Sequence, residues 1–292
     1  MESDLDKFQK RYGFSREIIG KTKYGRNIEA IRIGSGKRGI LINASHHARE
    51  WMTTILTMKT IEETAIAYQN DSIVKKKLDD IAVWFVPMVN PDGVTLQQLG
   101  VTEFPNNAQK LIIRLNNGST NFKQWKSNAE GIDPNRQYPS DWNNIDTSQA
   151  TKPGQAYYRG KQPLQIEETK AMVRLFESIK PLYTISYHTA GEIIFWHFMT
   201  NHKKGAIDQK MAQKFSEITG YDLMPKEYGH FGGGFNDWIL TEKNGSGVTI
   251  EIGTGTGEVK LSEWNSIWKK NKNNIWIAWG NAKEVANKNI SR

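Results

Sequence analysis

The sequence predicts a single α/β domain in which helices flank a mixed, mostly parallel sheet. Short apolar runs typical of strands alternate with longer helical stretches along the 292 residues. The run 81–89 is continuously apolar, as expected for a strand that is buried on both faces. No linker, internal repeat or low-complexity segment divides the chain, so we expect residues 1–292 to form one domain.

The expected strands follow from short-range patterns. Residues 27–33 alternate between polar and apolar side chains, as in a half-buried strand, and a glycine-containing turn leads from them to the apolar run 39–44. These two runs predict a hairpin. In chain order the expected strands are 27–33, 39–44, 81–89, 182–187 and 247–252.

Helical patterns separate these strands. Residues 1–20 indicate a short amphipathic helix and a connection, and Pro163 suits the first turn of a later helix, which the next two glutamates complement. Residues 100–160 are rich in polar residues and lack a clear period, which predicts an irregular segment that forms part of a site wall. The remaining expected helices are 52–68, 203–219 and one long helix at 262–288.

Charge and composition limit the partners and the location. The net charge is +8, from 39 Lys and Arg against 31 Asp and Glu, but the basic residues are spread along the chain, so we expect no nucleic-acid partner. The chain has no cysteine, which excludes disulfides and thiolate zinc sites. No apolar run is long enough to span a membrane, and no signal peptide is visible. We therefore expect a cytoplasmic location as the chain stands. We also expect a monomer.

Polar residues follow three of the expected strands. His47 and Glu50 come just after the second strand, His188 closes the fourth, and Glu251 lies near the end of the fifth. If these strands are neighbours in one sheet, the four side chains meet at its carboxyl edge. Two histidines and one carboxylate leave a fourth position open for water, which is typical of a catalytic zinc site. The alternative is that they are loop histidines and solvated acids.

Short motifs run through the chain from about residue 20 to residue 255. They are His-x-x-Glu at 47–50, Asn-Pro-Asp-Gly at 90–93, Asp-x-Asn-Arg at 133–136, Tyr-x-Gly-Lys at 158–161, His188 at a strand end, Gly-Gly-x-x-Asp-Trp at 233–238 and Thr-x-Glu at 249–251. In this order they resemble the zinc metallocarboxypeptidases of the carboxypeptidase A/B superfamily. The resemblance implies the metallocarboxypeptidase fold, one Zn²⁺ per chain and a peptide substrate.

Three segments are similar to one bacterial branch of that superfamily. They are 125–133, 188–196 and 248–253. The branch cleaves the bond between γ-D-glutamate and a diamino acid such as meso-diaminopimelate in peptidoglycan peptides. The similarity implies a bacterial enzyme that acts on cell-wall muropeptides, and a secreted or wall-associated location if the chain is a processed fragment. A general carboxypeptidase that removes C-terminal L-residues, and a zinc deacylase of the desuccinylase type, are the alternatives.

The resemblance also implies roles for individual residues. His47, Glu50 and His188 would be the zinc ligands, and Glu251 the general base. Asn135 and Arg136 match the anchor for the terminal carboxylate of the substrate, although Arg136 could instead form a structural ion pair. Arg49 would assist substrate binding or pair structurally.

The chain departs from the family pattern at two positions and carries an unusual residue at a third. The family has an arginine after a tryptophan to stabilise the oxyanion, but Trp125 is followed by Lys126, so either Lys126 or another cation such as Arg114 serves. Tyr228 lies about one position from the expected substrate-binding tyrosine. Asn236 falls at the specificity position of the pocket floor, where a neutral amide would suit a zwitterionic side-chain end such as that of diaminopimelate.

Overall fold

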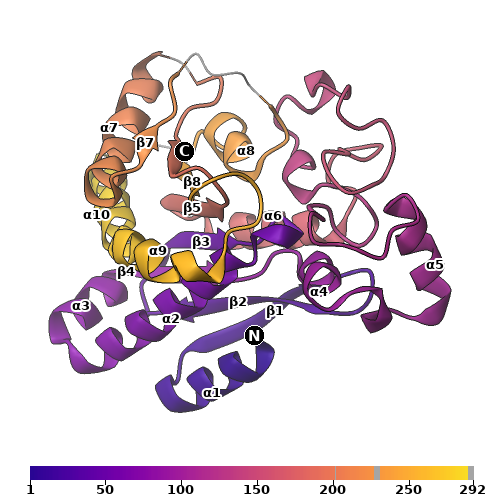
Figure 1. Cartoon of the computed structure of the whole chain (residues 1–292). Helices are drawn as coiled ribbons and strands as arrows, with labels where there is room; N and C mark the ends of the chain where they lie inside the picture. The colour runs from indigo at the N-terminus through magenta and orange to yellow at the C-terminus, as the bar shows by residue number, and fades with distance from the viewer. Residues whose placement is uncertain (201, 227–230, 289–292) are drawn as a thin grey trace.

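The computed structural model describes residues 1–200, 202–226 and 231–288. Within these residues, one eight-stranded mixed sheet runs through the molecule in the order β1-β2-β4-β3-β5-β8-β6-β7 (Figure 1). The strands are β1 (Ser15–Lys21), β2 (Asn27–Ile33), β3 (Arg38–Ala44), β4 (Ile81–Val86), β5 (Tyr183–His188), β6 (Ile193–Phe195), β7 (Asp222–Leu223) and β8 (Gly247–Glu251). This arrangement confirms the predicted α/β class.

Helices cover both faces of the sheet. They are α1 (Glu2–Tyr12), α2 (Met52–Asn70), α3 (Ser72–Asp80), α4 (Pro91–Leu99), α5 (Asn106–Leu115), α6 (Glu167–Ile179), α7 (His202–Thr219), α8 (Phe235–Thr241), α9 (Trp264–Asn271) and α10 (Asn274–Asn287). One face packs its strands against α1, α2, α3, α7, α9 and α10, and the other packs against α6 and α8. Among the described residues, no helix combines the length and apolarity needed to cross a bilayer.

The four central strands explain where a site can form. β4, β3, β5 and β8 are all parallel to their neighbours in this group, so their carboxyl ends lie at one edge of the sheet. β3 is buried along both faces beyond its first residue, as is typical of a strand in a parallel sheet that helices cover. The loops that follow Ala44, His188 and Glu251 are therefore brought together.

Several sequence predictions are wrong in detail. β2 and β3 do not form a hairpin, because β2 pairs with β1 and β4 whereas β3 lies between β4 and β5. β1 was not predicted. The segment 100–160 contains a helix, α5, and the motif at 90–93 begins another, α4, rather than a turn. The helix expected from Pro163 begins at Glu167.

The predicted C-terminal helix is divided in two. α9 ends at Asn271 and α10 begins at Asn274. At this break Asn271 donates a hydrogen bond to Tyr221 and Asn274 donates one to Tyr187. Both asparagines are buried, so the break between the two helices lies inside the core.

Candidate metal centre and catalytic cavity

A tight turn after β3 carries the first two candidate ligands. Ser45 has a φ of 49°, which reverses the chain directly after the strand. Its backbone N–H donates to Thr53 Oγ1 (3.0 Å), and its hydroxyl lies 2.8 Å from Thr54 Oγ1, so the turn is fastened to the start of α2. His47 precedes a short 3₁₀ turn that ends at Glu50. The three-residue spacing then directs both side chains to one point.

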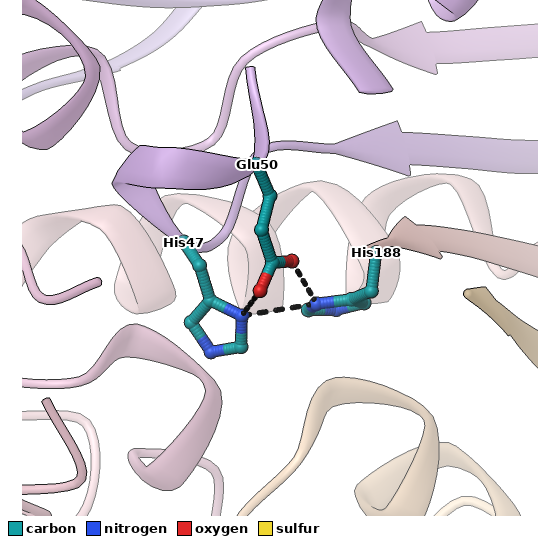
Figure 2. A group of neighbouring side chains, drawn as sticks. All are labelled: His47, Glu50 and His188. Atoms are coloured by element: carbon teal, nitrogen blue, oxygen red, sulfur yellow. Dashed lines mark hydrogen bonds and ion pairs between the residues drawn. The ribbon is translucent and has the colours of Figure 1, made fainter. Parts of the chain in front are cut away.

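His47, Glu50 and His188 meet in a buried cluster, as Figure 2 shows. His47 Nδ1 lies 2.8 Å from Glu50 Oε1, and His188 Nδ1 lies 2.9 Å from Glu50 Oε2. The two Nδ1 atoms are 3.1 Å apart. Potential ligand atoms of all three residues lie within 4.8 Å of one another. The prediction that these residues converge is correct.

The chemistry of this donor set fits a zinc ion. Asp133 Oδ1 accepts a hydrogen bond from His47 Nε2 (3.0 Å), which leaves the lone pair of His47 Nδ1 directed into the cluster. Burial lowers the pKa of His188 and favours its neutral ring, whereas the adjacent His47 and His188 hold the pKa of Glu50 well below its usual range despite its burial. Two imidazole nitrogens and a carboxylate that face one another are all acceptors, and a cation between them satisfies all three.

Glu251 lies beside this cluster because of the sheet register. β5 and β8 run parallel, and His188 is paired directly with Glu251. The Glu251 side chain lines a cavity of about 370 Å³ that His47 and His188 also line. Burial, followed by the negative charge of Glu50, raises the pKa of Glu251 to about 8. The carboxyl group therefore faces both the metal cluster and the space in which a substrate can bind.

Comparison with known proteins identifies the family. The family model described as zinc carboxypeptidase matches residues 1–273. The chain belongs to the zinc carboxypeptidase family. It is 32% identical over 277 residues to gamma-D-glutamyl-L-diamino acid endopeptidase 1 of Lysinibacillus sphaericus, a match that covers 92% of this chain and 68% of that protein. The predicted family, its hydrolytic activity and its zinc cofactor are thereby confirmed.

Two further comparisons agree with this assignment. Metallocarboxypeptidase A of Trichophyton tonsurans is 28% identical over 191 residues, which cover 61% of this chain and 39% of that protein. A crystal structure of thrombin-activatable fibrinolysis inhibitor superposes with a TM-score of 0.74 at 16% identity and covers 98% of this chain and 73% of that one. The structural likeness supports the fold.

The predicted carboxylate anchor faces the cavity of this zinc carboxypeptidase. Asn135 and Arg136 both line it, on a 3₁₀ turn that Asp133 caps by accepting from the backbone N–H of Asn135 (2.9 Å). Asn135 Oδ1 accepts from the backbone N–H of Phe235 (3.0 Å), which ties the turn to the start of α8. Within the described parts of the chain, no ion pair of Arg136 is present; its Nη1 donates to the Asn135 carbonyl (2.9 Å), and the residue lines the cavity. The alternative of a structural ion pair finds no support there.

Lys126 is the cation beside the metal cluster. Its Nζ lies 3.9 Å from Glu50 Oε1, and its side chain lines the cavity. Arg114 lies on α5, is exposed and does not line the cavity. Arg49 also lies outside the cavity wall, where its Nη1 donates to Gln124 (3.2 Å). Of the cations weighed from sequence for the oxyanion, the geometry favours Lys126.

The other two predicted substrate residues are placed differently. Asn236 is buried behind the cavity wall, where its amide oxygen accepts from Thr184 (2.7 Å) and its amide nitrogen donates to Thr249 (3.0 Å). Thr249 lines the cavity, and Asn236 does not. Any effect of Asn236 on specificity therefore acts through Thr249, and its role stays a prediction. Tyr228 lies outside the described residues.

Two residues of the sequence motifs turn out to support the site. Asp133 orients His47 through a hydrogen bond. It is the first residue of the motif Asp-x-Asn-Arg, from which the sequence predicted roles only for Asn135 and Arg136. Asn90 caps α4, and its amide nitrogen donates to the carbonyls of His46 (3.0 Å) and Ser127 (3.2 Å). It thereby joins the ligand loop to the loop that carries Lys126. The dipeptide Asn-Pro suggested only a turn.

Proposed function

We propose that this zinc peptidase cleaves the bond between γ-D-glutamate and a diamino acid in bacterial peptidoglycan peptides. The observation that carries the proposal is the similarity along nearly the whole chain to an endopeptidase named for that bond. The basic side chains of the cavity, which Asp237 and Glu251 also line, agree with it. Lys126, Arg136 and Lys226 line the cavity, and diaminopimelate presents two carboxylates to such a set of cations.

Glu251, Arg136 and Lys126 each have a separate role in the hydrolysis. Zinc, when bound, polarises the scissile carbonyl and lowers the pKa of a coordinated water. A Glu251 oxygen takes the proton from the attacking water and delivers it to the leaving amine nitrogen as the carbon–nitrogen bond breaks. The Arg136 guanidinium holds a substrate carboxylate, and the Lys126 ammonium stabilises the negative charge that develops on the carbonyl oxygen.

A general carboxypeptidase is the second candidate. The specific observation in its favour is the Asn135 and Arg136 pair in the cavity, which suits any free terminal carboxylate. The relative from Trichophyton tonsurans carries the name of such an enzyme. Both candidates share the metal cluster and Glu251, so only the substrate separates them.

The test is a substrate comparison with zinc-loaded protein. L-Ala-γ-D-Glu-meso-diaminopimelate and blocked all-L dipeptides are incubated separately, and mass spectrometry identifies the products, with Glu251→Gln as the blank. Release of diaminopimelate from the first peptide alone supports the proposal. Cleavage of the dipeptides alone contradicts it and favours the general carboxypeptidase. If neither is cut by zinc-loaded protein, acylated amino acids become the next substrates to test, as for a deacylase.

Three expectations remain predictions beside this proposal. They are the monomeric state, the absence of a nucleic-acid or membrane partner, and the cellular location. Size-exclusion chromatography with light scattering tests the first, because a monomer of this chain has a mass of 33.3 kDa.

A further inference from the structure

The family resemblance places Lys126 where the family has an arginine, and the two side chains are not equivalent. A guanidinium is a rigid planar fork, whereas an ammonium is a compact charge at the end of a flexible four-carbon stem. A lysine in this place needs something to hold its Nζ. In the structure, the ring of Tyr157 lies 5.2 Å from Lys126 Nζ, measured to the ring centroid. Both residues line the cavity.

The backbone around Tyr157 is fixed to the loops of the site. The carbonyl of Gln155 accepts hydrogen bonds from the backbone N–H groups of Lys126 (2.9 Å) and Ser127 (3.0 Å). The backbone N–H of Tyr157 donates to Asp133 Oδ2 (3.3 Å), and the other oxygen of Asp133 orients His47. These hydrogen bonds hold the segment that carries the ring against the loop of Lys126. Through Asp133, they also connect this segment to the metal ligand His47.

The conformation of Tyr157 also indicates a functional constraint. Its φ is 65°, in the left-handed region that residues other than glycine seldom adopt. Such conformations persist where the surroundings enforce them, and they cluster at active sites. Here the residue remains 37% exposed and lines the cavity instead of packing into the core.

We propose that Tyr157 is a positioning residue that holds the Lys126 ammonium over its ring, at the metal end of the cavity. The attraction between an ammonium and an aromatic face supplies the directionality that a lysine lacks and an arginine has. Tyr157 thereby acts through Lys126 on the charge that develops during hydrolysis. The inference rests on the proposed function only for the choice of substrate.

A double-mutant cycle tests whether Tyr157 acts through Lys126. The variants are Tyr157→Leu, Tyr157→Phe, Lys126→Met and the pair Tyr157→Leu with Lys126→Met. We expect Lys126→Met to lower kcat by about 100-fold and Tyr157→Leu to lower it by about tenfold with KM changed less than about threefold. Tyr157→Phe keeps the ring and should stay within about threefold of wild type. In the Lys126→Met background, Tyr157→Leu should lower kcat by less than about twofold.

A second readout needs neither zinc nor turnover. Lysines are reductively methylated with ¹³C, and the Lys126 resonance is assigned by its loss in Lys126→Arg. The ring of Tyr157 should shift the methyl protons of Lys126 upfield in wild type and in Tyr157→Phe, and Tyr157→Leu should remove that shift.

Three results would overturn the inference. They are an equal loss from Tyr157→Leu in both lysine backgrounds, a loss in Tyr157→Phe as large as that in Tyr157→Leu, and an unshifted Lys126 signal in wild type. The cycle is measured on whichever peptide the wild-type protein cleaves. The proposed function fails if wild type does not cut the γ-D-glutamyl peptide, and the inference fails on the ratios between variants, so the two failures are distinguishable.

Discussion

Neutralising Asp133 should weaken zinc binding without changing the ligands. Both oxygens of this buried carboxylate are used: Oδ1 accepts from His47 Nε2 and from the backbone of Asn135, and Oδ2 accepts from the backbone of Tyr157. In Asp133→Asn, one oxygen becomes an NH₂ group. In one orientation the NH₂ group faces the backbone N–H of Tyr157. In the other it faces His47 Nε2–H and the backbone N–H of Asn135, so a donor meets a donor in both cases.

The size of this effect can be worked from the same contacts. Although burial raises the pKa of Asp133, the His47 ring holds that pKa below its usual range, with Arg136 and Lys126 adding to the effect, so the residue is an anion that only accepts. Loss of such a partner of a metal-bound histidine costs about 10- to 100-fold in metal affinity. That range corresponds to about 1.4–2.7 kcal/mol.

Zinc affinity is measured by competition with a chromophoric chelator. The matched control is Asp92→Asn, which also neutralises a buried carboxylate but one that pairs with Arg26 (2.7 Å) and contacts none of the ligands. We expect Asp133→Asn to bind zinc about 10- to 100-fold more weakly and Asp92→Asn to bind it as wild type does. Wild-type affinity in Asp133→Asn, or an equal loss in both variants, would refute the reasoning.

Three further predictions follow from single residues. Glu251→Gln should lower kcat by about 10²- to 10⁴-fold while zinc stoichiometry by mass spectrometry stays at one, and an active variant would remove the general-base role. Arg136→Lys keeps the charge but loses the fork, and it should lower kcat/KM by about 30-fold, mainly through KM; unchanged steady-state kinetics would exclude Arg136 as the anchor. Burial raises the pKa of Glu168 to about 8, so the folded chain retains a proton that the unfolded chain releases above about pH 4.5. The free energy of unfolding should therefore fall as pH rises from about 4.5 to about 8. Glu168→Gln should flatten that fall and stabilise the chain at pH 8 by about 4 kcal/mol in urea unfolding, and identical slopes for both proteins would contradict the shift.

The metal cluster was predicted from residues at strand ends, on the condition that the strands are neighbours, and from the ordered motifs that resemble the family. An apolar run that stops at His47 or at His188 places those residues at the carboxyl edge, and parallel neighbours then bring them together. The spacing of His47 and Glu50 needed no long-range information. The pairing of β3 with β4 and β5, rather than with β2, was not predictable in this way, because local alternation does not specify partners.

The surroundings of the site depended on contacts between distant segments. Asp133 reaches His47 across 86 residues, and the Asn90 amide holds the carbonyls of His46 and Ser127, both far away in sequence. Tyr157 contacts Lys126 across 31 residues of sequence, and hydrogen bonds to the Gln155 carbonyl help to hold the two loops together. Asn236 could be placed in a motif from sequence. Its hydrogen bonds to Thr184 and Thr249, which direct its amide away from the cavity, could not be predicted in the same way.

Anomalous diffraction at the zinc edge tests the central claim most directly. Crystals of zinc-loaded protein are measured on both sides of the absorption edge. The account predicts one strong peak per chain, about 2.0–2.2 Å from His47 Nδ1, His188 Nδ1 and an oxygen of Glu50. A peak at other residues, or a fully active crystal without a peak at this cluster, would contradict it.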